Sequence, residues 1–308
     1  MSDAPLKQGP PLSRSVVLSG PLISLSRVLT SLALPDGRAS DCSNRPDSTK
    51  KKKPMKQSTR RVLLCSALWL CAFVPAAAQT SADAVKEAQR LTRVAQVAEQ
   101  QGRYDDAIKA YQTIAVIAKS SPRIAAAALL NAGNIYMSLG KFERAAACFR
   151  DSLALDQNSA PAQNNLGEAL GELKQYPHAL EAFQRAVALD GGFVKARYNM
   201  GVTYDRLGQL KYAEFWYRIL IRDHPDFSLA YDSLAVTLSK SGRGREAIPF
   251  HQKAISLNPK DPSFYYNFAV SYIVLGEVKK AQEQQQRLRA LDPAMAEHLG
   301  SVIAKHQQ

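Results

Sequence analysis

Small and apolar residues recur every 34 residues along residues 88–295, and this repeat is the strongest pattern in the chain. Within each period, apolar positions three and four residues apart predict two amphipathic helices. One Ala marks every period, at spacings of 38 and then four times 34 residues: Ala107, Ala145, Ala179, Ala213, Ala247 and Ala281. With four extra residues after the first period, the pattern predicts six helical hairpins, over residues 88–121, 126–159, 160–193, 194–227, 228–261 and 262–295.

Small and large side chains alternate between the two helices of each predicted hairpin. The first helix carries a small residue at Ala95, Gly133, Gly167, Gly201, Ala235 and Ala269. The second helix carries a ring in four hairpins, at Tyr111, Phe149, Phe183 and Tyr217, whereas His251 and Gln285 take its place later. A Gly marks the turn between the helices in five hairpins, with Lys174 as the exception. We expect the small residue to admit close helix packing and His251 to be a packed core residue.

These positional preferences resemble those of the tetratricopeptide repeat family, and the resemblance covers most of the chain after residue 78. The resemblance implies an all-α fold, a right-handed α-solenoid of about six hairpins with a concave groove. After the last repeat, residues 296–308 are expected to form a cap helix and tail. Pro293 can open that helix, and its apolar stripe is Met295, Leu299, Val302 and Ile303.

The resemblance also implies that the first helices line the groove. Four carboxamides share one position of these helices and form a predicted ladder: Asn131, Asn165, Asn199 and Asn267. A carboxamide can donate and accept, so it can pair with a peptide backbone without reading its sequence. The ladder resembles that of O-linked N-acetylglucosamine transferase repeat domains. Alternatively, these side chains bond to neighbours within the chain.

A second candidate group is Asn134, Asn165 and Lys195, whose positions resemble part of the clamp by which co-chaperones of the family hold a C-terminal carboxylate. Leu130 and Asn199 occupy the places of the two further cations of that clamp, which weakens the case for a carboxylate ligand.

The predicted groove changes character along its length. Glu168 and Glu172 make its middle acidic, whereas Tyr198 and Tyr266 are the strongest candidates for contact with apolar groups of a partner. The neighbouring repeats and the cap helix could also cover part of this apolar stretch.

Signals for catalysis and metal binding are weak. The five His residues lack the spacing of metal ligands, and no His is positioned to activate Cys148. The segment 242–247 has a glycine pattern like the edge of a dinucleotide fingerprint, but no strand precedes it. We therefore expect a non-catalytic protein without cofactor or metal.

Net charge argues against a nucleic-acid partner. The chain carries a formal charge of +13, but residues 1–78 hold 12 basic and 4 acidic residues and so supply +8 of it. The remaining 230 residues carry only +5, which is ordinary for a protein surface.

Residues 55–78 have the pattern of an export signal. A basic stretch at 55–61 precedes an apolar run at 62–74, and small residues follow at 75–78. We expect cleavage after Ala78, with residues 79–87 as a short lead-in, in a periplasmic or secreted protein. Met55 is then expected to be the true start, and residues 1–54 a disordered or untranslated upstream segment.

Other interpretations of this leader remain open. An uncleaved signal would anchor the chain in a membrane, and an organelle transit peptide is a further alternative. Arg60 and Arg61 resemble a twin-arginine motif, so the sequence does not separate the two export routes.

Together these patterns predict a scaffold that binds an extended polypeptide segment in its groove. The alternatives are an accessory subunit in cell-envelope assembly, a co-chaperone-like protein, the partner of a separate catalytic chain, or a glycan- or peptidoglycan-binding module. In the last case the groove tyrosines would stack on sugars.

Overall fold

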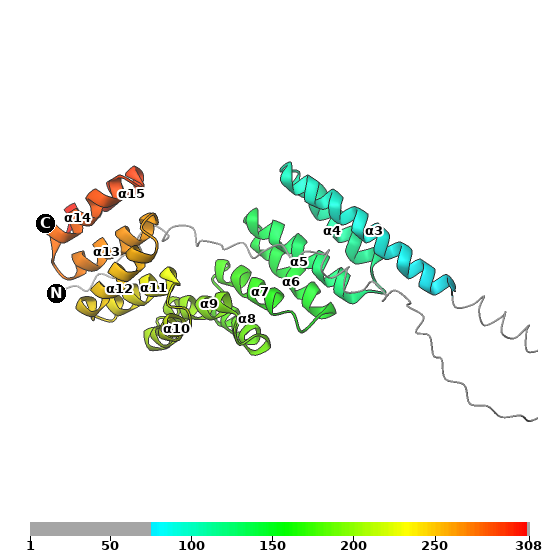
Figure 1. Cartoon of the computed structure of the whole chain (residues 1–308), viewed down its shortest axis with the longest axis horizontal. Coiled ribbons are helices and arrows are strands. Elements are labelled where there is room, and N and C mark those ends of the chain that lie inside the picture. The colour runs from blue at the N-terminus through cyan, green and yellow to red at the C-terminus, as the bar shows by residue number, and fades with distance from the viewer. Residues whose placement is uncertain (1–74, 307–308) are drawn as a thin grey trace, which may run out of the picture. The chain divides into compact units, whose positions relative to one another are not determined.

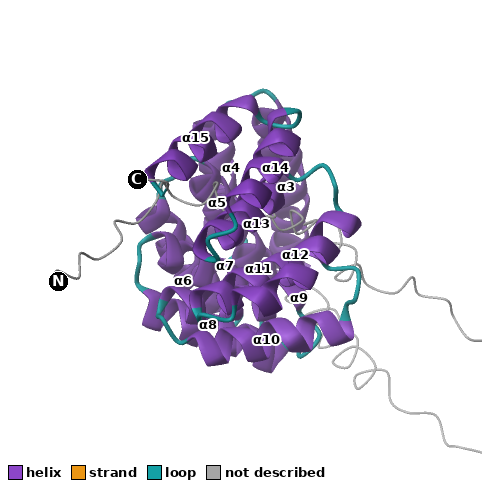
Figure 2. Ribbon diagram, turned by 90° about the vertical axis from the view of Figure 1, so that its left-hand side faces the viewer, coloured by secondary structure: helices purple, strands orange, loops and turns teal. Residues whose placement is uncertain are grey.

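The computed structural model describes residues 75–306, and every secondary-structure element in that part of the chain is an α-helix (Figures 1 and 2). This confirms the predicted all-α repeat solenoid. The helices are α3 Pro75–Gln100, α4 Tyr104–Ile117, α5 Pro122–Ser138, α6 Phe142–Leu155, α7 Ala160–Glu172, α8 Tyr176–Leu189, α9 Val194–Arg206, α10 Leu210–Asp223, α11 Ser228–Lys240, α12 Gly244–Leu257, α13 Pro262–Val274, α14 Val278–Arg289 and α15 Pro293–Lys305. None of these described helices combines the length and the apolar character needed to span a bilayer.

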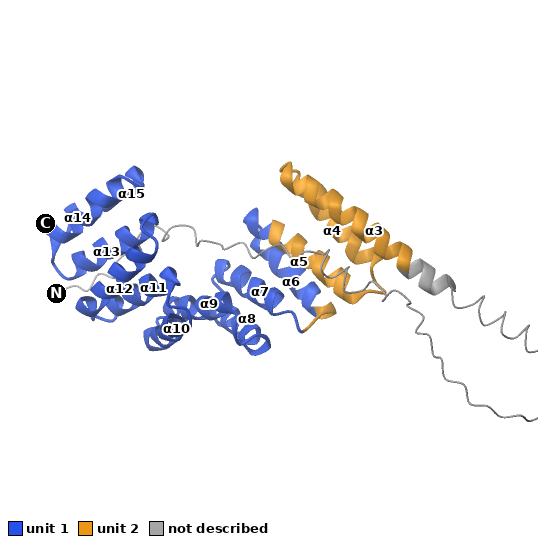
Figure 3. Cartoon of the chain, in the orientation of Figure 1, with its two compact units in different colours: residues 1–20, 136–153, 158–308 blue, residues 21–135, 154–157 orange. Residues whose placement is uncertain are grey.

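The chain divides into two compact units (Figure 3). Within the described residues, unit 2 comprises 75–135 and 154–157, and unit 1 comprises 136–153 and 158–306. The predicted export signal lies almost wholly outside the described residues. Only its last four residues, 75–78, are placed, in the first turn of α3.

Unit 2 is built on the pair α3 and α4, which pack through small residues and one ring. Ala95, Ala98 and Ala107 are fully buried, and Tyr111 of α4 is buried with them. Helix α3 runs through the predicted lead-in 79–87, and from residue 82 onward, where side chains are described, its first buried residue is Ala88. Helix α5 begins at Pro122, so the four residues after the first period form its first turn.

Unit 1 contains four complete hairpins, α7–α8, α9–α10, α11–α12 and α13–α14, followed by α15. The first helices start at residues 160, 194, 228 and 262, the first residues of the third to sixth periods. Each first helix contacts its own second helix and the first helix of the next hairpin. The first helices α7, α9, α11, α13 and α15 therefore form one layer.

In two hairpins of unit 1, the ring of the second helix packs directly on the small residue of the first helix. A Cβ atom at Gly167 would lie 2.6 Å from Phe183 Cε1, and one at Gly201 would lie 2.6 Å from Tyr217 Cε1. Real Cβ atoms do not approach a ring carbon so closely, because interiors are already close-packed. The alternation of small and large positions in the sequence thus reflects direct contact between the two helices.

The turn between the helices needs a left-handed residue. The turn glycines have φ between 69° and 77°. Lys174, the exception in the sequence, adopts the same conformation with φ of 58°, which L-residues rarely favour.

Helix α15 closes the apolar end of unit 1. The Asp292 side chain accepts a hydrogen bond from the Met295 backbone N–H and so caps the helix ahead of Pro293. Leu299 and Ile303 are buried against α13 and α14. The stripe predicted from the sequence is thus the packing face of this helix.

Candidate functional site

Six of the predicted groove residues lie on the first-helix layer of unit 1. We call this set the ladder surface, and it consists of Asn165 on α7, Lys195, Tyr198 and Asn199 on α9, and Tyr266 and Asn267 on α13. The other two, Asn131 and Asn134, lie on α5 in unit 2.

Glu168 organises the polar end of the ladder surface. Its Oε1 atom lies 2.8 Å from Lys195 Nζ and accepts hydrogen bonds from Asn164 Nδ2 at 2.8 Å and Asn199 Nδ2 at 2.9 Å. Asn165 Oδ1 accepts from Asn164 Nδ2 at 3.1 Å. Lys195 therefore already has a carboxylate partner from the chain itself. A ligand carboxylate at the predicted clamp would have to compete with Glu168 for this ammonium group.

Two ladder carboxamides are anchored by their nitrogen atoms to the preceding repeat. Asn199 Nδ2 also donates to Asn164 Oδ1 at 3.0 Å, and Asn267 Nδ2 donates to Asp232 Oδ2 at 2.7 Å. Neither Asn199 Oδ1 nor Asn267 Oδ1 accepts a hydrogen bond from another described residue, and both side chains are half-buried. Asn199 and Asn267 therefore present acceptors in fixed orientations, and their nitrogen atoms bond within the chain, which is the alternative that the sequence left open.

The two tyrosines of the ladder surface contact the next helix in the layer. The Tyr198 hydroxyl lies 3.1 Å from Ser233 Oγ, and its ring packs edge-on against Phe227 at 5.5 Å. Burial raises the pKa of Tyr198 to about 12, so its hydroxyl stays neutral near pH 7. Tyr266 stacks on His298 of α15 at 5.9 Å. Both rings remain half-buried, so part of each ring is left for a partner.

The two predicted groove residues of unit 2 differ in exposure. Asn131 is only 2% exposed, and its Oδ1 atom has no hydrogen-bond partner within residues 75–306. Asn134, three residues further along α5, is half-buried. Asn134 thus offers a partner more of its side chain than Asn131 does.

A buried polar network, which the sequence did not reveal, lies between α11, α12 and α13. His251 is fully buried, with Nδ1 2.9 Å from Asp232 Oδ1 and Nε2 2.8 Å from Ser271 Oγ. Asn267 joins through Asp232, and Ser239 Oγ lies 2.8 Å from Ser271 Oγ. We call these five residues the His251 network. The only sign of this network in the sequence was His251, a polar ring at a position that is Tyr or Phe in four other hairpins.

The His251 network has the carboxylate–imidazole–hydroxyl order of a hydrolase triad. Ser271 is only 2% exposed, however, and His251 stacks on Phe268 at 5.1 Å. A nucleophile must reach its substrate, so this arrangement is better suited to holding three helices together.

Within the described residues, the remaining cysteine and the possible metal ligands do not form a reactive centre. Burial raises the pKa of the Cys148 thiol, which disfavours the reactive thiolate. In residues 75–306, no three His, Cys, Asp or Glu side chains are grouped so that they could hold a metal ion.

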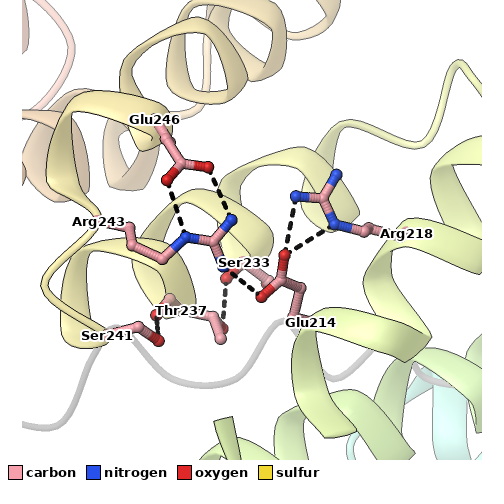
Figure 4. Close-up of polar contacts among 7 residues, drawn as sticks. All are labelled: Glu214, Arg218, Ser233, Thr237, Ser241, Arg243 and Glu246. Carbon is pink, nitrogen blue, oxygen red and sulfur yellow. Dashed lines mark hydrogen bonds and ion pairs between the residues drawn. The ribbon is translucent and has the colours of Figure 1, made fainter. Parts of the chain in front are cut away.

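Ion pairs on the second helices form a separate cluster (Figure 4). Arg243 contacts both Glu246 and Glu214, and Glu214 also pairs with Arg218, all within 2.9 Å. The cluster joins α10 to the start of α12. Surface pairs of this kind contribute little stability individually, so we assign this cluster a local structural role.

Comparisons with known proteins agree with the repeat architecture. Four family models described as tetratricopeptide repeat match residues 87–158, 130–192, 164–226, 230–263 and 252–283. No curated protein sequence matches this chain.

Several solved structures resemble the chain. The crystal structure of MamA protein is 28% identical, with a TM-score of 0.50, over 57% of this chain and 93% of that one. A tetratricopeptide repeat protein from Parabacteroides merdae is 19% identical, with a TM-score of 0.65, over 72% and 87%. PilW, a type IV pilus biogenesis factor, is 24% identical, with a TM-score of 0.60, over 70% and 98%. The last two likenesses concern the fold alone.

Proposed function

Because the chain belongs to the tetratricopeptide repeat family, we propose that it is a non-catalytic scaffold that binds an extended segment of a partner protein along the ladder surface. Stacked hairpins of this kind create long surfaces suited to protein partners. The fold does not determine the partner, which must be selected by the residues of the surface.

The observation that carries this proposal is the pair of unoccupied acceptors, Asn199 Oδ1 and Asn267 Oδ1. An extended peptide exposes backbone N–H groups, which can donate hydrogen bonds to these acceptors whatever the peptide sequence. Because the amide nitrogens are already bonded to Glu168 and Asp232, the acceptors are oriented before a ligand arrives. Preorganisation of this kind lowers the entropic cost of binding.

The test begins with a crosslinked pull-down that identifies the bound segment, followed by titration of that peptide. We expect Asn199→Ala and Asn267→Ala each to weaken binding by about 1 kcal/mol, the net value of one hydrogen bond. Gln184→Ala, at an exposed position of α8, should leave affinity unchanged. Thermal unfolding of each variant separates lost binding from lost structure, since both Asn side chains also bond within the chain.

Equal affinity for wild type and both Asn variants would argue for another surface. Loss of binding in Tyr198→Ala, with both Asn variants unaffected, would favour the alternative in which a ring stacks on a sugar or an apolar side chain. The half-buried rings of Tyr198 and Tyr266 are the specific observation behind that alternative.

We also propose that the chain acts outside the cytoplasm, as a periplasmic or secreted protein. The basic, apolar and small-residue segments of 55–78 support this location. Among residues whose side chains are described, the first buried one is Ala88, so cleavage after Ala78 would remove no described core residue.

N-terminal sequencing of the full chain, expressed with a C-terminal tag in a bacterial host, tests this location. We expect exported protein that begins at Gln79, and no cleavage in the Ala76→Leu, Ala78→Leu double variant, because the peptidase reads small residues there. Ala82→Leu, four residues past the predicted site, should be cleaved normally. Protein that retains residues 1–54, or that stays in the cytoplasm, would contradict the proposal.

A further inference from the structure

A second candidate site lies in unit 1 on α6, α7 and α8. A cleft of about 200 Å³ opens there, and we call it the α8 cleft after the helix that supplies most of its charged residues. Its polar lining includes Arg150 of α6, Gln163 of α7, and His178, Glu181 and Arg185 of α8.

The α8 cleft and the ladder surface use opposite faces of α7. Successive residues of an α-helix are rotated by about 100°, so Gln163 and Leu170 share one face. By the same rotation, Asn165 and Glu168 lie on the opposite face. The cleft is therefore separate from the proposed peptide surface, and the inference below does not rest on that function.

Gln163 gives the wall of the α8 cleft an acceptor that is unpaired within the described residues. Its side chain is 7% exposed, and its buried Oε1 atom has no hydrogen-bond partner within residues 75–306. A buried acceptor without a donor is costly, and almost all such groups in folded proteins are paired. Because Oε1 is itself closed to water, a ligand N–H group could reach it only after the Gln163 side chain turns toward the cleft, and the new hydrogen bond would then remove this cost.

The charged side chains of the cleft are also without ion-pair partners in the described part of the chain. Arg150 and Arg185 are exposed, and although Glu181 and Arg185 are four residues apart on α8, they form no salt bridge. By contrast, Arg243 is engaged by two glutamates (Figure 4). Two guanidinium groups and one carboxylate leave one positive charge to be matched.

We propose that the α8 cleft binds one acidic side chain of a partner protein, together with the backbone N–H beside it. The ligand carboxylate would pair with Arg150 and Arg185, which suit carboxylates because they donate from a planar fork. The neighbouring backbone N–H would donate to Gln163 Oε1. Small-molecule sites usually occupy roughly 300–1,000 Å³, so this smaller cleft suits a side chain better than a free cofactor.

An NMR titration of the full chain with the peptide acetyl-Ala-Gly-Glu-Gly-Ala-amide tests this proposal. We expect saturable shifts of the Arg150 and Arg185 Nε–H signals and of the Gln163 side-chain amide. The matched peptide with Gln in place of Glu should bind at least tenfold more weakly. Sodium acetate should shift the two arginine signals without the glutamine signal. Equal binding of both peptides, or acetate binding as tightly as the Glu peptide, would overturn the proposal.

Substitutions in the α8 cleft test whether the Glu peptide binds there. The Arg150→Gln, Arg185→Gln double variant should weaken the Glu peptide at least tenfold, and its exposed positions should leave the fold intact. The Lys211→Gln, Lys253→Gln control removes the same charge from exposed positions of α10 and α12 and should bind normally. Equal weakening in the control would reduce the effect to net charge and refute the site.

Gln163→Leu separates peptide recognition from simple anion binding. It should weaken the Glu peptide several-fold but leave acetate binding unchanged, and it should not lower thermal stability because it removes an unpaired buried acceptor. Unchanged peptide affinity in this variant would refute the role of Gln163. Asn267→Ala on the ladder surface should not affect this cleft, so failure here and failure of the proposed function remain distinguishable.

Discussion

Replacing Gly201 with Val is expected to lower the free energy of unfolding by about 3 kcal/mol, the upper part of the usual range for overpacking. Even one added carbon at this position would lie 2.6 Å from Tyr217 Cε1. Tyr217 cannot easily withdraw, because it is 2% exposed and packs among buried residues of α10, α11 and α12 and partly buried residues of α9. Chemical denaturation followed by circular dichroism measures the loss.

Gly171→Ala is the control for an added side chain, because no atom beyond its own helix turn lies within 4 Å of the Cβ position there. This residue lies inside α7, so the substitution should be neutral or stabilise by up to about 1 kcal/mol through lower chain entropy. Tyr217→Leu in the Gly201→Val background should recover part of the loss, since it makes room for the new side chain. A Gly201→Val protein as stable as Gly171→Ala would contradict the packing described here.

Asp232→Ala is expected to cost about 3 kcal/mol, since breaking a buried pair leaves its partners without compensation. The substitution removes the acceptor of Asn267 Nδ2 and the partner of His251 Nδ1. Both Asp232 and His251 are buried, so water cannot easily replace the lost carboxylate. Thermal and denaturant unfolding of the variant measure this loss.

A double-mutant cycle shows whether the loss comes from the pair. Replacing Asp232 and His251 together by Leu should cost less than the sum of the two single changes by at least about 1 kcal/mol, because neither partner is then left unpaired. Arg243→Gln, in the exposed cluster of Figure 4, should cost less than about 1 kcal/mol. Additive losses for Asp232 and His251 would show that the network does not act as a unit.

The periodic features of the fold could be predicted from the sequence because each recurs at a fixed position. The contact of Gly201 with Tyr217, for example, follows from a small residue and a ring 16 residues apart in the same hairpin. The starts of the first helices in unit 1 follow from the same spacing, and α15 follows from Pro293 and its apolar stripe.

The partners of the ladder residues could not be predicted, because they come from positions that do not repeat. Glu168 was assigned to an acidic groove, whereas in the structure it neutralises Lys195 and binds Asn199. The His251 network likewise requires residues 19 and 20 positions away on two other helices. Charge and period alone do not show which polar atoms meet across helices.

The bonds between successive first helices differ in chemistry at every junction of unit 1. They comprise Lys195 with Glu168, Tyr198 with Ser233, Asn267 with Asp232, and Tyr266 with His298. The polar groups that each first helix presents thus match only those of its own neighbour. Although the hairpins share one plan, we expect that reordering, deleting or duplicating a hairpin would place an unmatched polar group against the next helix. The order of the hairpins is therefore specified by the polar contacts between successive first helices.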